Sequence, residues 1–208
     1  PGFFESTPLM IDGVLYAPNG IGFVEAFDAG SGATLWVEAP LDEGPNRYAG
    51  TVTRGVAYWT DGEQGRILVQ RGEYLMALDA KTGAHLRDFG ANGRVNLSRD
   101  LERGLTHAWS GAPIVVGDVV IVGHSTNDTF DSKTAGRGDV RAYDVRTGKL
   151  AWIFHVIPQR GEFGTDTWEN ESWTYTGHDS VWSLFSADDE LGLLYMPLSA
   201  PTNDMYGG

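Results

Sequence analysis

Cysteine is absent from the entire chain of 208 residues. This absence excludes disulfide bonds and metal sites built from thiolates, and it leaves the redox compartment open. Long apolar runs are also missing, since no stretch approaches the ~18 consecutive apolar residues of a membrane-spanning helix. No signal peptide begins the chain, and because Pro1 is not a natural start we expect a preceding segment.

Positive charge is scarce. The 15 Lys and Arg residues are outnumbered by 28 Asp and Glu residues, which gives a net charge of −13. A surface of this sign repels a phosphate backbone, so we expect no nucleic-acid partner. The 28 glycines are typical of a turn-rich all-β chain.

Several catalytic motifs are also missing, among them HExxH, the phosphate-binding Gly-Lys loop, the G-x-S-x-G elbow and the Rossmann glycine pattern. The acidic run 188–190 is interpreted as a solvated hairpin turn in preference to a calcium site. No histidine has metal-ligand spacing, so surface or hydrogen-bonded roles are favoured for all five: His85, His107, His124, His155 and His178.

A repeated segment is the main positive signal. Residues 26–36 read AFDAGSGATLW, residues 77–87 read ALDAKTGAHLR, and residues 142–152 read AYDVRTGKLAW. In each, an Asp caps a tight turn and a Gly supplies the positive φ that the turn requires. Each segment is therefore predicted to be a β-hairpin, and the recurrence predicts a repeat architecture.

A second hairpin precedes each of these segments, for example TPLMIDGVLYAP at 7–18 with its turn at Asp12 and Gly13. Two hairpins make a four-stranded antiparallel unit, and such units predict the blades of an all-β propeller. The chain holds three such units and the first half of a fourth, which is short of a closed ring. The incomplete ring would be completed by the rest of the propeller or by a second copy. The predicted blades are approximately 7–36, 51–87, 112–152 and the start of a fourth at 181–197.

The tryptophans that end two repeats suggest how the blades join. Trp36 and Trp152 are predicted to pack between neighbouring blades, over the turn glycine of the next unit. Arg87 occupies this place in the second repeat, so the second interface is predicted to be more polar. The long polar segments 124–138 and 155–180 are candidates for functional loops.

The chain resembles the pyrroloquinoline-quinone (PQQ) dependent dehydrogenases, which are eight-bladed periplasmic quinoproteins. The resemblance rests on AxDxxTGxxxW repeats and on four stretches that resemble the membrane-type glucose dehydrogenase branch. These are VTRGVAYW (52–59), GDVRAYDVRTGKLAWIFH (138–155), RGEFGTDTWENESW (160–173) and LLYMPLSAPTNDMYGG (193–208). As in that branch, the adjacent cysteines of other members are missing, with Ala49 and Gly50 in their place.

The resemblance implies a set of cofactor-binding residues. Arg54 matches an arginine that meets the PQQ carboxylates, a role that suits a planar guanidinium. Glu5 matches an acidic residue near the quinone, and Ser110 and Ser125 match hydroxyl groups that bond a quinone carboxylate. Trp182 matches the indole on which the flat cofactor lies.

The resemblance also implies a divalent metal, Ca²⁺ or Mg²⁺, with Asp128 as its ligand. Ala200 stands where some members have an Asn ligand, and Thr202 and Asn203 are candidate substitutes. No catalytic residue is assigned in this chain, because the family's catalytic base is expected beyond Gly208. The fragment alone is therefore expected to be inactive.

The resulting hypothesis is the N-terminal half of a PQQ-dependent oxidoreductase that acts on CH–OH groups of a sugar or alcohol and passes electrons to a quinone or cytochrome. A periplasmic location is implied, with membrane association through a segment outside this chain left open. One alternative is a cofactor-free propeller scaffold for protein–protein interaction. Another is a carbohydrate-binding propeller that would use exposed aromatics such as Trp59, Trp109 and Trp182.

Overall fold

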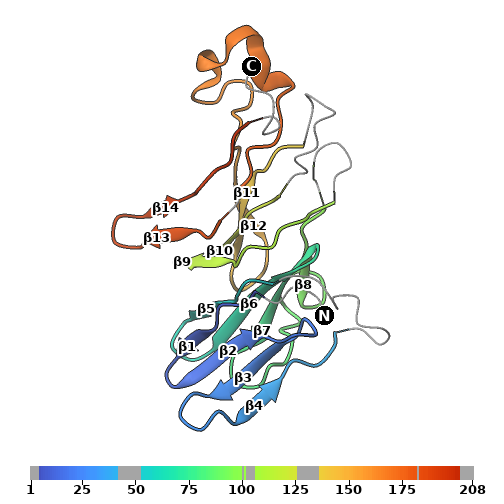
Figure 1. Cartoon of the computed structure of the whole chain (residues 1–208), viewed down its shortest axis with the longest axis vertical. Coiled ribbons are helices and arrows are strands. Elements are labelled where there is room, and N and C mark those ends of the chain that lie inside the picture. The colour runs from blue at the N-terminus through green and yellow to red at the C-terminus, as the bar shows by residue number, and fades with distance from the viewer. Residues whose placement is uncertain are drawn as a thin grey trace.

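The structure is a computed structural model and describes residues 5–41, 53–99, 101, 106–125, 136–181 and 183–201. It consists of three four-stranded antiparallel sheets and one two-stranded sheet, and consecutive sheets lie beside one another (Figure 1). Helix in the described residues is limited to two short 3₁₀ segments, η2 (Thr165–Thr167) and η3 (Glu169–Thr174). The predicted all-β fold is confirmed.

Each sheet is built from strands in sequence order. The first contains β1 (Leu9–Ile11), β2 (Val14–Pro18), β3 (Val24–Asp28) and β4 (Thr34–Val37). The second contains β5 (Ala57–Thr60), β6 (Gly65–Arg71), β7 (Tyr74–Asp79) and β8 (Arg94–Asn96). The third contains β9 (Ile114–Val116), β10 (Val119–Val122), β11 (Val140–Asp144) and β12 (Leu150–Phe154), and the fourth contains β13 (Ser186–Asp188) and β14 (Leu193–Tyr195).

The three repeated turns have the predicted chemistry. The Asp79 carboxylate accepts hydrogen bonds from the backbone N–H of Thr82 at 2.9 Å and from its hydroxyl at 2.8 Å. Matching pairs join Asp28 to Ser31 and Asp144 to Thr147. The glycine that follows has a positive φ in every case, at Gly32, Gly83 and Gly148. These aspartates therefore stabilise the turns.

In the second sheet the last strand begins later in the chain than the repeat predicts. The repeat predicts a return strand directly after Gly83, but β8 begins only at Arg94. Between them, His85 makes only an isolated bridge to Leu78, and positive φ angles at Gly90 and Gly93 turn the chain back. The fourth strand therefore pairs further along β7, opposite its first residues.

The contact between the first and second sheets is called the first joint and is centred on Trp36 and Gly83. The indole of Trp36 lies so close over Gly83 that a Cβ atom there would fall within 2.4 Å of the ring. The indole N–H donates to the carbonyl oxygen of Ala80 at 3.1 Å, and the hydroxyl of Tyr16 donates to the same oxygen at 3.2 Å. The predicted packing of Trp36 is confirmed.

A buried ion pair accompanies the indole at the first joint. The Glu38 carboxylate lies 2.6 Å from a guanidinium nitrogen of Arg71, and each side chain is 1% exposed. Glu38 also lies 3.2 Å from Nε2 of His85 and accepts the backbone N–H of Val24 at 2.8 Å. Burial alone would raise the pKa of Glu38, but the bonds from His85 and Arg71 outweigh it and hold the pKa at about 2.

The contact between the second and third sheets is called the second joint, and it contains Gly90, Val95 and Gly148. The buried guanidinium of Arg66 donates to the carbonyl oxygen of Arg146 at 2.8 Å. The backbone N–H of Gly90 donates to the carbonyl oxygen of Thr147 at 2.8 Å. These polar contacts lie at the turn glycine, whereas elsewhere in the joint apolar side chains of both sheets form one buried cluster that includes Leu68 and Ile121. A more polar second interface, predicted from Arg87, is therefore found only at the turn.

Trp152 does not follow the prediction made for it. Its side chain on β12 is 38% exposed, and its neighbours Ile153 and Phe154 are exposed to a similar degree. In the described part of the chain the fourth sheet has only β13 and β14, which belong to its opening hairpin. A turn glycine that could cover Trp152 is therefore not found among the described residues.

Substitution of Gly83 by Ala tests the first joint. Gly83 and Gly13 both have positive φ, but only Gly83 faces a ring, since nothing lies within 4 Å of a Cβ atom built at Gly13. We expect Gly13→Ala to lower the free energy of unfolding by ~1–2 kcal/mol through backbone strain alone. Gly83→Ala should cost a further ~1–3 kcal/mol because the ring must move. Urea unfolding measures both, and equal losses would contradict the docking of Trp36.

The buried pair predicts a response to acid. Glu38→Gln should lower the free energy of unfolding by ~3–5 kcal/mol at neutral pH, because Arg71 then stays buried without its partner. Because the folded pKa of Glu38 lies below the unfolded value of 4.5, its contribution is present above pH 4.5 and is lost as the pH falls toward 2. Urea unfolding at several pH values would measure this, with Glu63→Gln on an exposed turn as the control. A Glu38→Gln variant as stable as the control would refute the role.

Candidate functional site

Two of the predicted cofactor-binding residues form an ion pair. A guanidinium nitrogen of Arg54 lies 2.9 Å from a carboxylate oxygen of Glu5, and the side chains are 43% and 51% exposed. The backbone supports this contact, because the N–H of Thr7 donates to the carbonyl oxygen of Arg54 at 2.8 Å. The segments before β1 and β5 therefore lie side by side and present an accessible cation with its carboxylate.

The segment that precedes β9 also lies next to the segments that precede β1 and β5. A Cβ atom on Gly55 would lie 3.2 Å from the Cβ of Ala112 and 3.3 Å from the carbonyl oxygen of Thr7. Ala112 follows Ser110 by two residues. Glycine at position 55 thus allows the entry segments of three sheets to approach one another.

Ser110 and Ser125 flank the hairpin of β9 and β10. The backbone N–H of Ser125 donates to the carbonyl oxygen of Ala108 at 2.6 Å, which brings the two flanking segments together beyond the strands. Both serines are partly exposed. Their hydroxyl groups are accessible to a ligand at this end of the third sheet.

Trp109 connects this region to the fourth sheet. Its indole N–H donates to the carbonyl oxygen of Val181 at 3.2 Å, and its ring packs on Phe185 at a centroid distance of 5.5 Å. A Cβ atom at Gly111 or Gly123 would overlap the ring. Trp109 is buried and its N–H is bonded, so it is a packing residue, and it gives no support to the carbohydrate-binding alternative.

Two predicted site residues, Asp128 and Trp182, lie outside the described residues, as do Thr202 and Asn203. The described residues contain no group of three or more His, Cys, Asp or Glu side chains that could hold a metal ion. At Ala200, where some relatives have an Asn ligand, the carbonyl oxygen lies 3.0 Å from Nδ1 of His178. A Ca²⁺ or Mg²⁺ site therefore stays a prediction, and we derive no chemical step through it.

Unsatisfied hydroxyl groups flank the ion pair. The buried hydroxyls of Ser6 and Thr53 have no hydrogen-bond partner in the described structure, and they adjoin Glu5 and Arg54 in the chain. A buried hydroxyl without a partner is costly, so such groups point to a ligand or to water. These two hydroxyls are neighbours in the chain of the accessible guanidinium and its carboxylate.

A stacked pair of histidines was not predicted from the sequence. The rings of His107 and His124 lie 5.1 Å apart with planes inclined by 25°, and both residues are nearly fully buried. Nε2 of His107 and both ring nitrogens of His124 have no partner in the described structure. Burial, the neighbouring ring and Arg141 lower the pKa of His107 to about 3, and burial and Arg141 lower the pKa of His124 to about 4. Both rings are therefore neutral at physiological pH.

Strained backbone precedes the predicted stacking residue Trp182. His178 and Asp179 both have positive φ, at 67° and 57°, which is costly for side chains with a Cβ atom. Burial raises the pKa of Asp179 to about 6. No sequence motif indicated either residue, because the strain arises from the path of the chain between the third and fourth sheets.

Comparison with known proteins identifies the family. Residues 2–208 match the family described as "PQQ: Glucose/ethanol/alcohol dehydrogenase, beta-propeller domain". The chain belongs to this family. Its members use PQQ, and the four-stranded sheets are those of a partial propeller of this type.

Two relatives come from Pseudomonas putida. The chain is 34% identical over 205 residues to quinohemoprotein alcohol dehydrogenase ADH IIB, a match that covers 92% of this chain and 27% of the relative. It is 31% identical to quinohemoprotein alcohol dehydrogenase ADH-IIG, covering 92% of this chain and 26% of the relative. The chain thus spans about a quarter of the length of these relatives.

Solved structures give the same family and fold. The quinohemoprotein alcohol dehydrogenase ADHIIG from Pseudomonas putida HK5 superimposes with a TM-score of 0.72 at 29% identity, covering 97% of this chain and 29% of that chain. A europium-containing methanol dehydrogenase superimposes with a TM-score of 0.68 at 26% identity, covering 96% and 36%. BamB from Moraxella catarrhalis, at 15% identity and a TM-score of 0.51, shares the fold alone.

The comparisons correct the expected branch. Quinoprotein glucose dehydrogenase A from Acinetobacter calcoaceticus is 33% identical, but this match covers only 64% of the chain. The quinohemoprotein alcohol dehydrogenases match over 92%, so the findings favour them over the membrane glucose dehydrogenases. Within the described residues, no helix has the length and apolar character needed to cross a bilayer.

The histidine pair predicts a loss of stability in mild acid. In the unfolded chain the two imidazoles become protonated near pH 6.5. In the folded chain they stay neutral until the pH falls to about 4 for His124 and about 3 for His107. Their contribution is therefore complete above pH 6.5 and falls as the pH decreases from 6.5 to 4, with a slope of at most ~2.7 kcal/mol per pH unit for two protons. The measurement is the free energy of unfolding against pH for the wild type and for His107→Phe with His124→Phe.

The double variant should have a flatter profile between pH 6.5 and 4.5, above the range in which Glu38 titrates. Asp179 acts in the opposite sense in this window, but its effect cancels in the difference between the two proteins. Phe163→Ala, at a fully exposed ring that does not titrate, is the control and should keep the wild-type slope. A double variant with an unchanged slope would contradict the assignment.

Proposed function

We propose that this chain forms the N-terminal part of a PQQ-dependent dehydrogenase that oxidises the CH–OH group of an alcohol or a sugar. The observation that carries the proposal is the ion pair of Arg54 and Glu5 at the place where the entry segments of three sheets meet. Alcohols are the favoured substrate class, because the relatives matched over most of the chain are named alcohol dehydrogenases.

Arg54 is the main cofactor contact in this proposal. Its planar guanidinium can donate two parallel hydrogen bonds to a PQQ carboxylate. The ion pair with Glu5 holds this guanidinium in an accessible position. Ser110 and Ser125 would donate their hydroxyls to a carboxylate at the end of the third sheet. The free hydroxyl of Thr53 adds a donor beside Arg54.

Trp182 would supply a flat indole surface for the cofactor ring, and Asp128 would be the metal ligand contributed by this chain. The backbone of Val181, one residue before Trp182, is held by the indole N–H of Trp109. When bound, PQQ supplies the two-electron chemistry that oxidises the substrate. The residues of this chain bind and orient it.

The same proposal implies an electron acceptor and a cellular compartment for the protein. Electrons would pass to a quinone or a cytochrome, in line with relatives named "Alcohol dehydrogenase (quinone), dehydrogenase subunit" and with the quinohemoproteins. The protein would work in the periplasm. The catalytic base would come from a later blade, supplied by the rest of the propeller or by a second copy.

Arg54→Ala tests this proposal in the complete polypeptide that contains this chain. We expect PQQ binding to weaken by ~2–4 kcal/mol, because a desolvated carboxylate then loses its charged partner. Titration of PQQ followed by tryptophan fluorescence measures the affinity. Arg87→Ala is the matched control, since Arg87 is exposed and bonds Asn92 at 2.8 Å in the segment between β7 and β8.

The control should bind PQQ like the wild type. A wild-type protein that does not bind PQQ at all would support the cofactor-free scaffold. An Arg54→Ala variant with full affinity would show that the cofactor lies elsewhere.

A further inference from the structure

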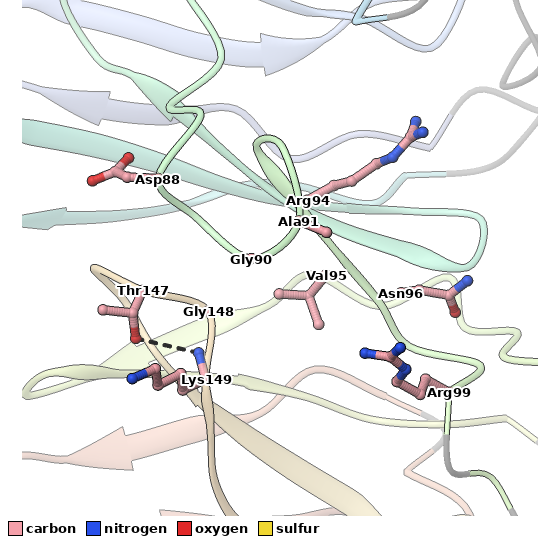
Figure 2. A pocket seen from close by; sticks show the side chains of 10 residues that line it. All are labelled: Asp88, Gly90, Ala91, Arg94, Val95, Asn96, Arg99, Thr147, Gly148 and Lys149. Atoms are coloured by element: carbon pink, nitrogen blue, oxygen red, sulfur yellow. Dashed lines mark hydrogen bonds between the residues drawn. The ribbon is translucent and has the colours of Figure 1, made fainter.

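The second joint contains a hollow beside its turn glycine. At the first joint an indole covers the turn glycine, Gly83. At the second joint the corresponding glycine is Gly148, and a Cβ atom there would meet Cγ2 of Val95 at 2.6 Å and the backbone nitrogen of Gly90 at 2.9 Å. An isopropyl group and a glycine backbone replace a bicyclic ring, and a hollow of about 700 Å³ lies beside them (Figure 2).

The hollow has an apolar wall and a positively charged rim. Its volume is within the range typical of sites for small organic molecules. Figure 2 shows the turn at 147–149 facing the segment that carries residues 88–99. The lining residues are Asp88, Gly90, Ala91, Arg94, Val95, Asn96, Arg99, Thr147, Gly148 and Lys149.

The sign of this charge is opposite to that of the chain. Three cationic side chains and one carboxylate line the hollow, whereas the chain as a whole carries −13. The carboxylate, Asp88, already lies 3.4 Å from a guanidinium nitrogen of Arg66. The hollow is thus a local site of positive potential, which attracts anions.

Two of the cations are available to a ligand. Arg94 is occupied, because its guanidinium leads away from the hollow and lies 4.7 Å from the centre of the Tyr74 ring. In the part of the chain that the structure describes, the side chains of Arg99 and Lys149 have neither a hydrogen bond nor an ion pair. Arg99 follows the last strand of the second sheet, and Lys149 belongs to the outer turn of the third. A ligand between them would contact both sheets.

The neutral lining is compatible with an organic anion. The side-chain oxygen of Asn96 accepts the N–H of Ser98 at 2.8 Å, which leaves its amide N–H groups as donors. The hydroxyl of Thr147 is already used, since it donates to Asp144 at 2.7 Å. Gly90, Ala91 and Val95 offer apolar surface to a short hydrocarbon body.

We propose that the hollow at the second joint binds a small organic anion, whose carboxylate or phosphate oxygens lie between Arg99 and Lys149. The bound anion joins the second sheet to the third beside Gly148, the turn glycine that no indole covers in the described structure. This site is separate from the ion pair of Glu5 and Arg54, and it does not depend on the proposed function.

Titration calorimetry with citrate and with inorganic phosphate as probes tests the proposal on the folded chain. Arg99→Gln with Lys149→Gln removes both cations and should weaken binding by about tenfold or more, as expected for the loss of charge-assisted hydrogen bonds. Both side chains are exposed, so the variant should keep the circular dichroism spectrum and the unliganded Tm of the wild type. Lys81→Gln is the control, because Lys81 lies on the outer turn of the second sheet and does not line the hollow.

The expected result is binding of at least one probe by the wild type and by Lys81→Gln, weakening with added sodium chloride because the contact is ionic. The same probe should raise the Tm of these two proteins but not that of the double variant. Preference for citrate or for phosphate would identify the oxyanion. The proposal is overturned if neither probe binds the wild type at millimolar concentration, or if the double variant binds as well as the wild type.

Discussion

Each joint between neighbouring sheets depends on a glycine that the preceding turn holds at positive φ. The aspartate of the repeat fixes this turn through two bonds to the Ser or Thr three residues later, and the glycine then lies against the neighbouring sheet. Because no Cβ atom is present, the neighbour can approach to van der Waals contact. At Gly83 that neighbour is the indole of Trp36, and at Gly148 it is Val95 with the backbone of Gly90.

The two joints are stabilised by different interactions. The first combines an indole with a buried ion pair between Glu38 and Arg71. The second combines an apolar cluster shared by both sheets with the guanidinium of Arg66 bonded to backbone carbonyl groups and the indole of Trp59 bonded to Asp118. It leaves a hollow next to its glycine. A single change in the repeat, from tryptophan to Arg87, accompanies this difference.

These joints also place the candidate cofactor site. The packing of the sheets brings their entry segments together, and Thr7, Arg54 and Ala112 meet around Gly55. Residues that are 49 positions apart, Glu5 and Arg54, thereby form one ion pair. Three of the residues proposed to bind PQQ, Glu5, Arg54 and Ser110, lie in short entry segments that no strand contains, so their arrangement depends on the packing of the sheets behind them.

The turn chemistry was predictable from the sequence, because an Asp, a Ser or Thr and a Gly at fixed spacing determine a local structure by themselves. The docking of Trp36 was predictable from the repeat, because a tryptophan that ends one unit can pack on the turn glycine that recurs in the next. The late position of β8 was not, since the turns at Gly90 and Gly93 fall outside the repeat.

The sequence also did not predict several contacts between segments that are remote in the chain. The stacked pair of His107 and His124 has no signal in the sequence, because only the pairing of the flanking segments brings the rings together. The structural role of Trp109 has a signal in retrospect, in the glycines at 111 and 123 that make room for its ring.

An experimental structure of the complete polypeptide with PQQ is the most direct measurement of the central claim. The account predicts that a PQQ carboxylate lies within hydrogen-bond distance, about 3 Å, of the Arg54 guanidinium, at the meeting point of the three entry segments. A structure in which PQQ binds elsewhere, with Arg54 still paired only to Glu5, would contradict it.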